Sequence, residues 1–208
     1  MSKNSDADHD PGVLSAVGES SIEAQNIQRL VELQNLLDSS GLDEYPNSPI
    51  AIEYRNVDLT KHRLIYDGML KMKIGDTRKI REIELYVLLL EDCIMLLQKQ
   101  DQKFFLNFFV SKAARGSSSR KFCHSPIIKY STLLVRPVAT DKRAFYLLNT
   151  TENGPQIYEL AAKSKDDRNK WFKHITEASK FYKERNCRQS NFLTKQTQNE
   201  LNDLYLPD

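Results

Sequence analysis

Residues of the types that perform catalysis are scattered along this sequence instead of gathered at catalytic spacing. The four histidines and three cysteines lie far apart, and the chain has no glycine-rich phosphate loop, nucleophile elbow or zinc-binding helix motif. Cys123 and His124 are neighbours, but no further metal-ligating residue lies close to them in the sequence. The pattern therefore predicts no catalytic residue, no metal site and no cofactor, and it favours a binding module over an enzyme.

One short segment, KMKIGDTRKIR at residues 71–81, does gather positive charge. Alternation along a strand puts its first two lysines on one face, and a tight turn brings the later cations to the same end of the sheet. The candidate residues are Lys71, Lys73, Arg78, Lys79 and Arg81. Several charge-assisted donors acting together can bind a phosphoinositide head group, so the segment predicts weak binding to anionic membrane. A solvated hairpin is the alternative, since Glu82 and Glu84 follow directly.

The overall charge gives no reason to expect a nucleic-acid partner. Thirty basic residues are nearly matched by 28 acidic ones, for a net charge of +2, so only local clusters matter. A second basic stretch, residues 112–124, could assist membrane binding or accept phosphate on a serine, and a plain flexible loop is the alternative. Neither basic stretch offers an aromatic platform on which bases could stack.

A hydrophobic strand at residues 144–149 is the second feature that could bind a partner. Successive side chains of a strand point to opposite faces. Phe145 and Leu147 therefore face one way, and Tyr146 and Leu148 face the other. Both pairs are largely apolar, whereas a strand in a small antiparallel sheet usually keeps one face polar. One of the two pairs must pack in the core, and something has to cover the other.

The outward-facing pair would have an apolar neighbour on the next strand, either Ile157 or Tyr158. An exposed apolar patch of this kind is typical of a protein-interaction site. The alternative is that the N-terminal helix or the linker after it covers this face of the strand.

The elements that must position these residues begin with a helix. Residues 1–20 have almost no large apolar side chains and are predicted to be disordered. Residues 22–38 are predicted to form an amphipathic helix, and residues 39–60, with two prolines, to form a linker. The apolar stripe of the helix consists of Ile27, Leu30, Leu33 and Leu37. This stripe needs a partner, either the following domain or something outside the chain.

Seven short apolar segments rich in β-branched and aromatic residues follow, separated by turn-forming residues. They are residues 64–74, 82–91, 93–100, 103–110, 127–131, 144–149 and 156–162. Their connections are too short for the crossovers that parallel strands require. The expected fold is therefore mainly β, a bent seven-stranded antiparallel sandwich or barrel over residues 61–186.

A last helix closes this domain. Ser164 can cap it, and two aspartates follow in its first turn. Apolar residues then recur at helical spacing, and the single tryptophan, Trp171, is predicted to anchor the helix in the core. The polar tail, residues 187–208, is predicted to be flexible.

The chain is expected in the cytosol, with at most peripheral membrane contact. Its N-terminus lacks the apolar core of a signal peptide, and three cysteines cannot all pair within the chain. The longest apolar run, residues 85–90, is far shorter than the roughly 20 residues of a membrane span.

A seven-stranded sandwich closed by a helix with one tryptophan resembles the pleckstrin homology (PH) domain. The resemblance covers residues 22–183 and is closest to the PH domain of Lbc-type Rho guanine nucleotide exchange factors, in the subgroup that also carries a regulator-of-G-protein-signalling domain. Four segments carry it: RNVDLTKHRLIYDG (55–68), VLLLEDCIMLLQKQD (87–101), VRPVATDKRAF (135–145) and NGPQIYELAA (153–162).

The resemblance implies a partner. In that family a hydrophobic patch on this strand docks GTP-bound Rho, and Tyr146 and Leu148 match the patch positions, with Tyr in place of a more usual Phe and Leu in place of a more usual Ile. The family's catalytic Dbl homology domain precedes the PH domain, and residues 22–38 resemble only the end of its last helix. The resemblance thus implies a non-catalytic module that binds activated Rho.

Overall fold

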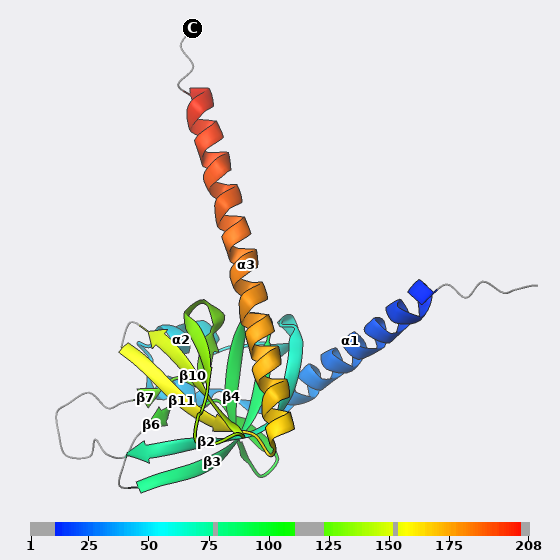
Figure 1. The fold of residues 1–208 in the computed structure, drawn as a ribbon. Helices are drawn as coiled ribbons and strands as arrows, with labels where there is room; N and C mark the ends of the chain where they lie inside the picture. Colours follow the sequence, from blue (N-terminus) through cyan, green and yellow to red (C-terminus); the bar gives the residue numbers. More distant parts are fainter. Residues whose placement is uncertain (1–10, 77–78, 111–122, 152–153, 205–208) are drawn as a thin grey trace, which may run out of the picture.

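The strand-forming segments fold into a strongly bent, largely antiparallel sheet (Figure 1). A computed structural model describes residues 11–76, 79–110, 123–151 and 154–204. The elements in chain order are α1 (Pro11–Leu36), β1 (Leu37–Asp38), η1 (Ser40–Glu44), α2 (Pro49–Tyr54), η2 (Leu59–Lys61), β2 (Leu64–Asp76), β3 (Lys79–Leu90), β4 (Cys93–Gln100), β5 (Lys103–Phe105), β6 (Phe109–Val110), β7 (Cys123–His124), β8 (Ile127–Lys129), η4 (Tyr130–Thr132), β9 (Leu133–Pro137), β10 (Ala144–Thr151), β11 (Gly154–Ala161) and α3 (Lys165–Leu204).

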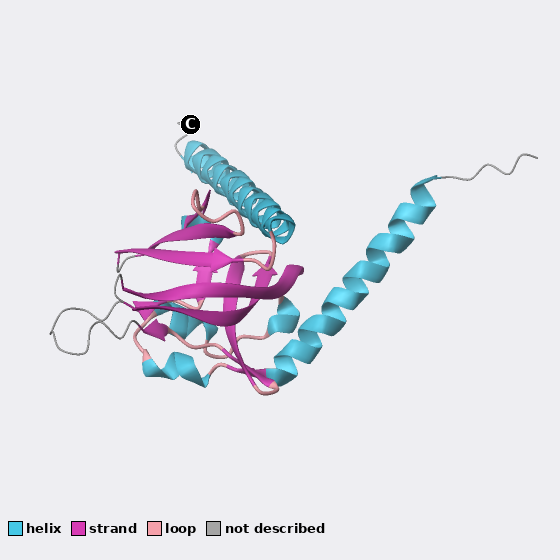
Figure 2. Ribbon diagram, turned by 60° about the horizontal axis from the view of Figure 1, so that its bottom comes forward, coloured by secondary structure: helices cyan, strands magenta, loops and turns pink. Residues whose placement is uncertain are grey.

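The order of strands in the described part of the main sheet is β1-β5-β4-β3-β2-β11-β10-β9, with β8 pairing beside β4. The strands β6 and β7 form a separate two-stranded sheet. Figure 2 shows that strands of the sheet run in crossing directions, which reflects the strong bend of the sheet. This architecture, with one helix after the last strand, confirms the predicted mainly-β fold. Among the described residues it adds three short strands that were not predicted, β1, β7 and β9.

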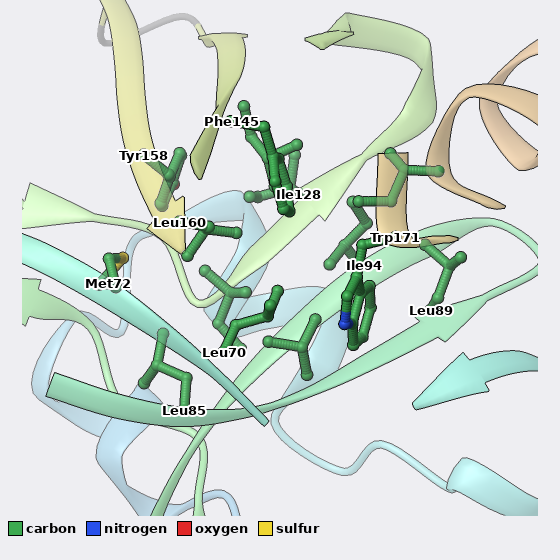
Figure 3. Close-up of a cluster of buried hydrophobic side chains, with 14 of the residues drawn as sticks. Leu70, Met72, Leu85, Leu89, Ile94, Ile128, Phe145, Tyr158, Leu160 and Trp171 are labelled. Carbon is green, nitrogen blue, oxygen red and sulfur yellow. The ribbon is translucent and has the colours of Figure 1, made fainter. Parts of the chain in front are cut away.

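The first hydrophobic core lies inside this bend (Figure 3). The sheet supplies alternate residues of its strands, among them Leu70, Leu89 and Phe145, and α3 closes the open end with Trp171 and Ile175. The tryptophan is 1% exposed, as predicted, and Tyr66 meets it edge-on at a ring-centroid distance of 4.7 Å. The backbone amide of Asp167 donates to the Ser164 hydroxyl at 3.1 Å, so the predicted cap starts α3.

A second hydrophobic core covers the other face of β3 and β4. It explains why every residue from Leu85 to Leu90 is buried although their side chains alternate between the two faces of the sheet. The covering layer consists of the end of α1 and the segment that contains η1, α2 and η2, from which Leu42, Ala51 and Leu59 are fully buried. The prediction of a plain linker at residues 39–60 is therefore wrong, because its apolar residues complete this core.

The apolar stripe of α1 is divided by this packing. Leu30 and Leu33 are each 1% exposed within the second core, whereas Ile27 remains 55% exposed. A polar contact fixes the helix beside them: the Arg29 guanidinium donates to the Tyr86 hydroxyl at 2.6 Å. The stripe therefore packs mainly on its own domain, as one of the two alternatives stated.

The long helices α1 and α3 differ in their ends from the prediction (Figures 1 and 2). The predicted end of the first helix at residue 38 is wrong, because Leu37 and Asp38 form β1 and pair with β5. The helix α1 begins at Pro11, within the stretch predicted to be disordered. Once packing has fixed part of a helix, each further residue that becomes helical adds one backbone hydrogen bond, so the helix can extend beyond its packed turns. The helix α3 continues to Leu204, through most of the tail predicted to be flexible, and no glycine or proline interrupts residues 187–204.

Candidate functional site

Three aliphatic side chains lie in one line across the outer face of β9, β10 and β11. Leu148 of β10 pairs with Leu134 of β9 on one side and with Ile157 of β11 on the other. Leu134 is 46% exposed and Ile157 is 55% exposed, and Leu148 between them is half-buried. Directly opposed cross-strand side chains touch, so these three residues form a continuous apolar surface, which we call the apolar row.

The inner face of the same strands fills the first core. Phe145 and Leu147 are fully buried, so Tyr146 and Leu148 are the pair that faces outward. Tyr158, which was predicted as a patch residue, is only 1% exposed, and its ring lies in the core (Figure 3). Its hydroxyl donates to the carbonyl oxygen of Ser125 at 2.9 Å, and burial raises its pKa. The placement of Tyr158 in the patch is therefore wrong: of the two candidates on β11, Ile157 points outward.

A line of polar side chains runs beside the apolar row, one pair of residues further along the strands. It consists of Arg136, Tyr146, Glu159, Lys73 and Glu82, each paired with the next across β9, β10, β11, β2 and β3. We call it the polar row. Within it the Lys73 ammonium donates to the Glu159 carboxylate at 2.5 Å, and this hydrogen bond raises the pKa of Lys73. Tyr146 is half-buried, with its ring bordering the apolar row.

Three of the five predicted lipid-binding cations, Lys71, Lys73 and Arg81, have side chains that the structure describes. Lys73 is engaged by Glu159, and the Lys71 ammonium lies 4.0 Å from the carboxylates of both Glu82 and Glu84. Arg81 is exposed. The side chains of Arg78 and Lys79, like most of the basic stretch 112–124, lie outside the described residues. The positive charge of β2 is thus largely compensated by neighbouring acids.

Three histidines elsewhere in the described residues, His62, His124 and His174, lie at separate places. In the parts of the chain that the structure describes, no group of His, Cys, Asp and Glu side chains could hold a metal ion. His62 pairs with Asp92 at 3.2 Å, His124 meets the Tyr158 ring edge-on, and His174 stacks on Tyr66. Each of these histidines serves as a packing or hydrogen-bonding residue at a separate place.

A groove of about 690 Å³ lies between α1 and the start of β2. Ile22, Ile27 and Leu30 line it from α1, and Lys61, His62 and Arg63 line it from the other side. The groove lies beside Leu30 of the second core, and one strand, β11, separates β2 from β10 in the sheet order. Of these two partly apolar surfaces, the apolar row is the one that contains the strand predicted to bind a protein partner.

Leu134 is a member of the apolar row that sequence reasoning missed. The segment Leu133–Pro137 was not predicted to be a strand, because it is short and ends in proline. The signal that could have revealed it is the run Leu133, Leu134, Val135 between two turn-forming stretches. Adding this strand beside β10 converts two apolar residues into a row of three.

The described strand order, the bend of the sheet and the position of α3 define the PH class of domains. A family model described as "PH domain" matches residues 48–180, which is more than half of the chain. The chain is 42% identical to Rho guanine nucleotide exchange factor 11 from Homo sapiens over 167 residues, covering 80% of the chain and 11% of that protein. It is 43% identical to Rho guanine nucleotide exchange factor 12 from Mus musculus, covering 79% of the chain and 10% of that protein.

Two solved structures of exchange-factor DH/PH domains are similar to this chain. The DH/PH domains of PDZ-RhoGEF, in a complex with GTP-gamma-S activated RhoA, match with a TM-score of 0.70 and 37% identity over 82% of this chain and 44% of that one. The DH/PH domains of p115-RhoGEF match with a TM-score of 0.71 and 32% identity, over 80% of this chain and 44% of that one. The chain belongs to the PH domain family, in the branch found in Lbc-type Rho guanine nucleotide exchange factors.

The chain spans about a tenth of the length of exchange factors 11 and 12. In its described residues, no helix has the length and apolar character that crossing a membrane requires.

Proposed function

We propose that this chain is a non-catalytic PH module that binds GTP-bound Rho through the apolar row and so localises or regulates Rho exchange signalling. The observation that carries the proposal is the apolar row of Leu134, Leu148 and Ile157. Both ends of this row are about half exposed, so no other described element covers it. Tyr146 borders this line, and Tyr158 is excluded because it is buried.

A similar solved structure supports a Rho partner, and the energetics of apolar burial support an interface at the apolar row. A similar structure, 37% identical to this chain, is that of DH/PH domains in complex with activated RhoA. The apolar row itself is a surface whose burial is favourable, at roughly 25 cal/mol per Å² of apolar area removed from water. Three adjacent aliphatic side chains at the centre of an interface can therefore anchor a partner, with the polar row as part of the rim.

The test is binding of the chain to RhoA loaded either with GTPγS or with GDP, measured by biolayer interferometry. We expect the GTPγS form to bind more tightly. Leu148→Glu should weaken this binding more than about tenfold, since it removes an aliphatic contact and places a carboxylate under the partner. Ile52→Glu is the matched control, because Ile52 is 68% exposed on α2, which covers the second core and not β10.

Equal binding of the two nucleotide forms, or unchanged affinity of Leu148→Glu, would contradict the proposal. The non-catalytic part has a separate assay. Release of a fluorescent guanine nucleotide from RhoA should proceed at the same rate with and without the chain, and a clear acceleration would show that the chain itself promotes exchange.

A further inference from the structure

The Tyr146 hydroxyl is a polar group at the border of the apolar row. Tyr146 precedes Leu148 by two residues on β10, so the two side chains are neighbours on the same face of the strand. The Tyr146 ring extends the apolar surface, and its hydroxyl adds a polar group. Across the strands it is paired with Arg136 and Glu159. Within the described part of the chain, its hydroxyl makes no hydrogen bond.

The neighbours of Tyr146 already have other partners. The Glu159 carboxylate accepts from the Lys73 ammonium at 2.5 Å. The Arg136 guanidinium donates to the Val135 carbonyl oxygen at 3.3 Å and has no carboxylate partner in the described residues. A phenol donates a hydrogen bond readily, and the positive charge of Arg136 beside it makes an oxygen acceptor more favourable there than a cation.

A partner that covers the apolar row must also cover this border. A hydroxyl that loses water without gaining a hydrogen bond costs free energy, whereas a hydroxyl that finds an acceptor adds affinity and orientation. A partner that presents an acceptor to the Tyr146 hydroxyl gains a hydrogen bond. A partner that covers the hydroxyl with neither an acceptor nor room for a bridging water loses its hydration.

We infer that Tyr146 is a specificity-determining residue, whose hydroxyl donates to a carbonyl or carboxylate oxygen on the surface that covers the apolar row. The inference rests on the proposed function and refines it. The partner surface then has two parts, an aliphatic patch that meets Leu134, Leu148 and Ile157, and an oxygen acceptor at its edge that meets Tyr146. A GTPase that is aliphatic at this place but lacks the acceptor would bind more weakly.

The experiment compares Tyr146→Phe with the unaltered chain for binding to GTPγS-loaded RhoA. The variant keeps the ring and removes one oxygen, so we expect its affinity to fall about three- to tenfold, the loss of one neutral hydrogen bond. Tyr66→Phe is the matched control, because the Tyr66 ring packs against Trp171 and His174 on β2 and should leave affinity unchanged. Thermal unfolding of both variants verifies that the fold is intact.

Leu148→Glu tests the apolar row as the binding surface, and Tyr146→Phe tests the hydroxyl contact separately. If Leu148→Glu has no effect, the apolar row is not the binding surface and the proposed function fails. If Leu148→Glu abolishes binding but Tyr146→Phe binds as tightly as the unaltered chain, or more tightly, the row is correct and the hydroxyl contact is refuted. Loss of affinity in both variants, with Tyr66→Phe unchanged, supports the inference.

Discussion

Replacing Leu33 by alanine tests whether α1 and the segment after it are part of the domain or an appendage. Leu33 is 1% exposed in the second core, where the end of α1 meets η2 and the outer face of β3 and β4. Truncation of a fully buried leucine loses its transfer free energy and leaves a cavity, at a cost of about 2–5 kcal/mol. If the two cores unfold together, this cost lowers the stability of the whole domain.

The single tryptophan provides the assay. Trp171 lies in the first core, on the opposite side of the sheet from Leu33, so its fluorescence during urea unfolding reports on a core that the substitution does not touch. With a denaturant slope of about 2 kcal/mol per molar urea, the midpoint should fall by about 1–2.5 M. Val31→Ala, on the same helix but at a side chain that is 38% exposed, is the control and should shift the midpoint only slightly.

Independent unfolding of the two cores would contradict this prediction. If the Trp171 transition keeps its midpoint in Leu33→Ala while circular dichroism detects loss of helix at lower urea, α1 and the covering segment unfold on their own. The second core would then be a weakly attached layer, and the outer face of β3 would be available to other partners. Coincident transitions in both probes, shifted together, show one cooperative unit.

Three other results are expected. The hydrogen bond to Asp92 raises the pKa of His62, so the stability that this pair contributes is fully present below the unfolded-state pKa near 6.5 and is lost as pH rises through the higher folded-state pKa. The urea midpoint of the unaltered chain should therefore decrease between pH 6 and pH 8.5, and His62→Asn should make this decrease smaller. An unchanged decrease in the variant would exclude His62 as its source. Arg29→Met should remove the guanidinium link to Tyr86 and lower thermal stability by a few degrees, whereas an unchanged midpoint would show that this contact is dispensable. Co-sedimentation with anionic liposomes should be weak, and charge reversal at Arg81 should abolish what there is; strong sedimentation that survives Arg81→Glu would locate the lipid site elsewhere.

The regular elements of this fold could be predicted from the sequence because they depend on local patterns. Alternation and β-branched runs predicted seven strand segments, and the capping serine and helical spacing predicted α3 with Trp171 inward. The ends of α1 and α3 could not be predicted, since helix length beyond the packed turns depends on propagation from a stable nucleus. The covering segment was missed because its short helices are stabilised by distant strands and not by their own residues.

The candidate site was predictable only in part. The two apolar faces of β10 indicated that some residues must remain outside, but the sequence left open which pair that was. The same ambiguity placed Tyr158 in the patch: its neighbour Ile157 is equally apolar, and only the register of β11 against β10 decides which of them points outward. Leu134 required knowledge of β9, whose pairing with β10 is non-local.

The strands β3 and β10 both have apolar side chains on both faces, but they differ in how these faces are covered. From Leu85 to Leu90 both faces of β3 are apolar, and both are buried, because α1 and the covering segment supply a second core. Both faces of β10 are largely apolar as well, but no described element lies over Leu148 and its neighbours on β9 and β11. The same kind of two-sided apolar strand is therefore covered on both faces at β3 and on one face only at β10. This contrast within one sheet is the physical basis for proposing that a partner covers the apolar row.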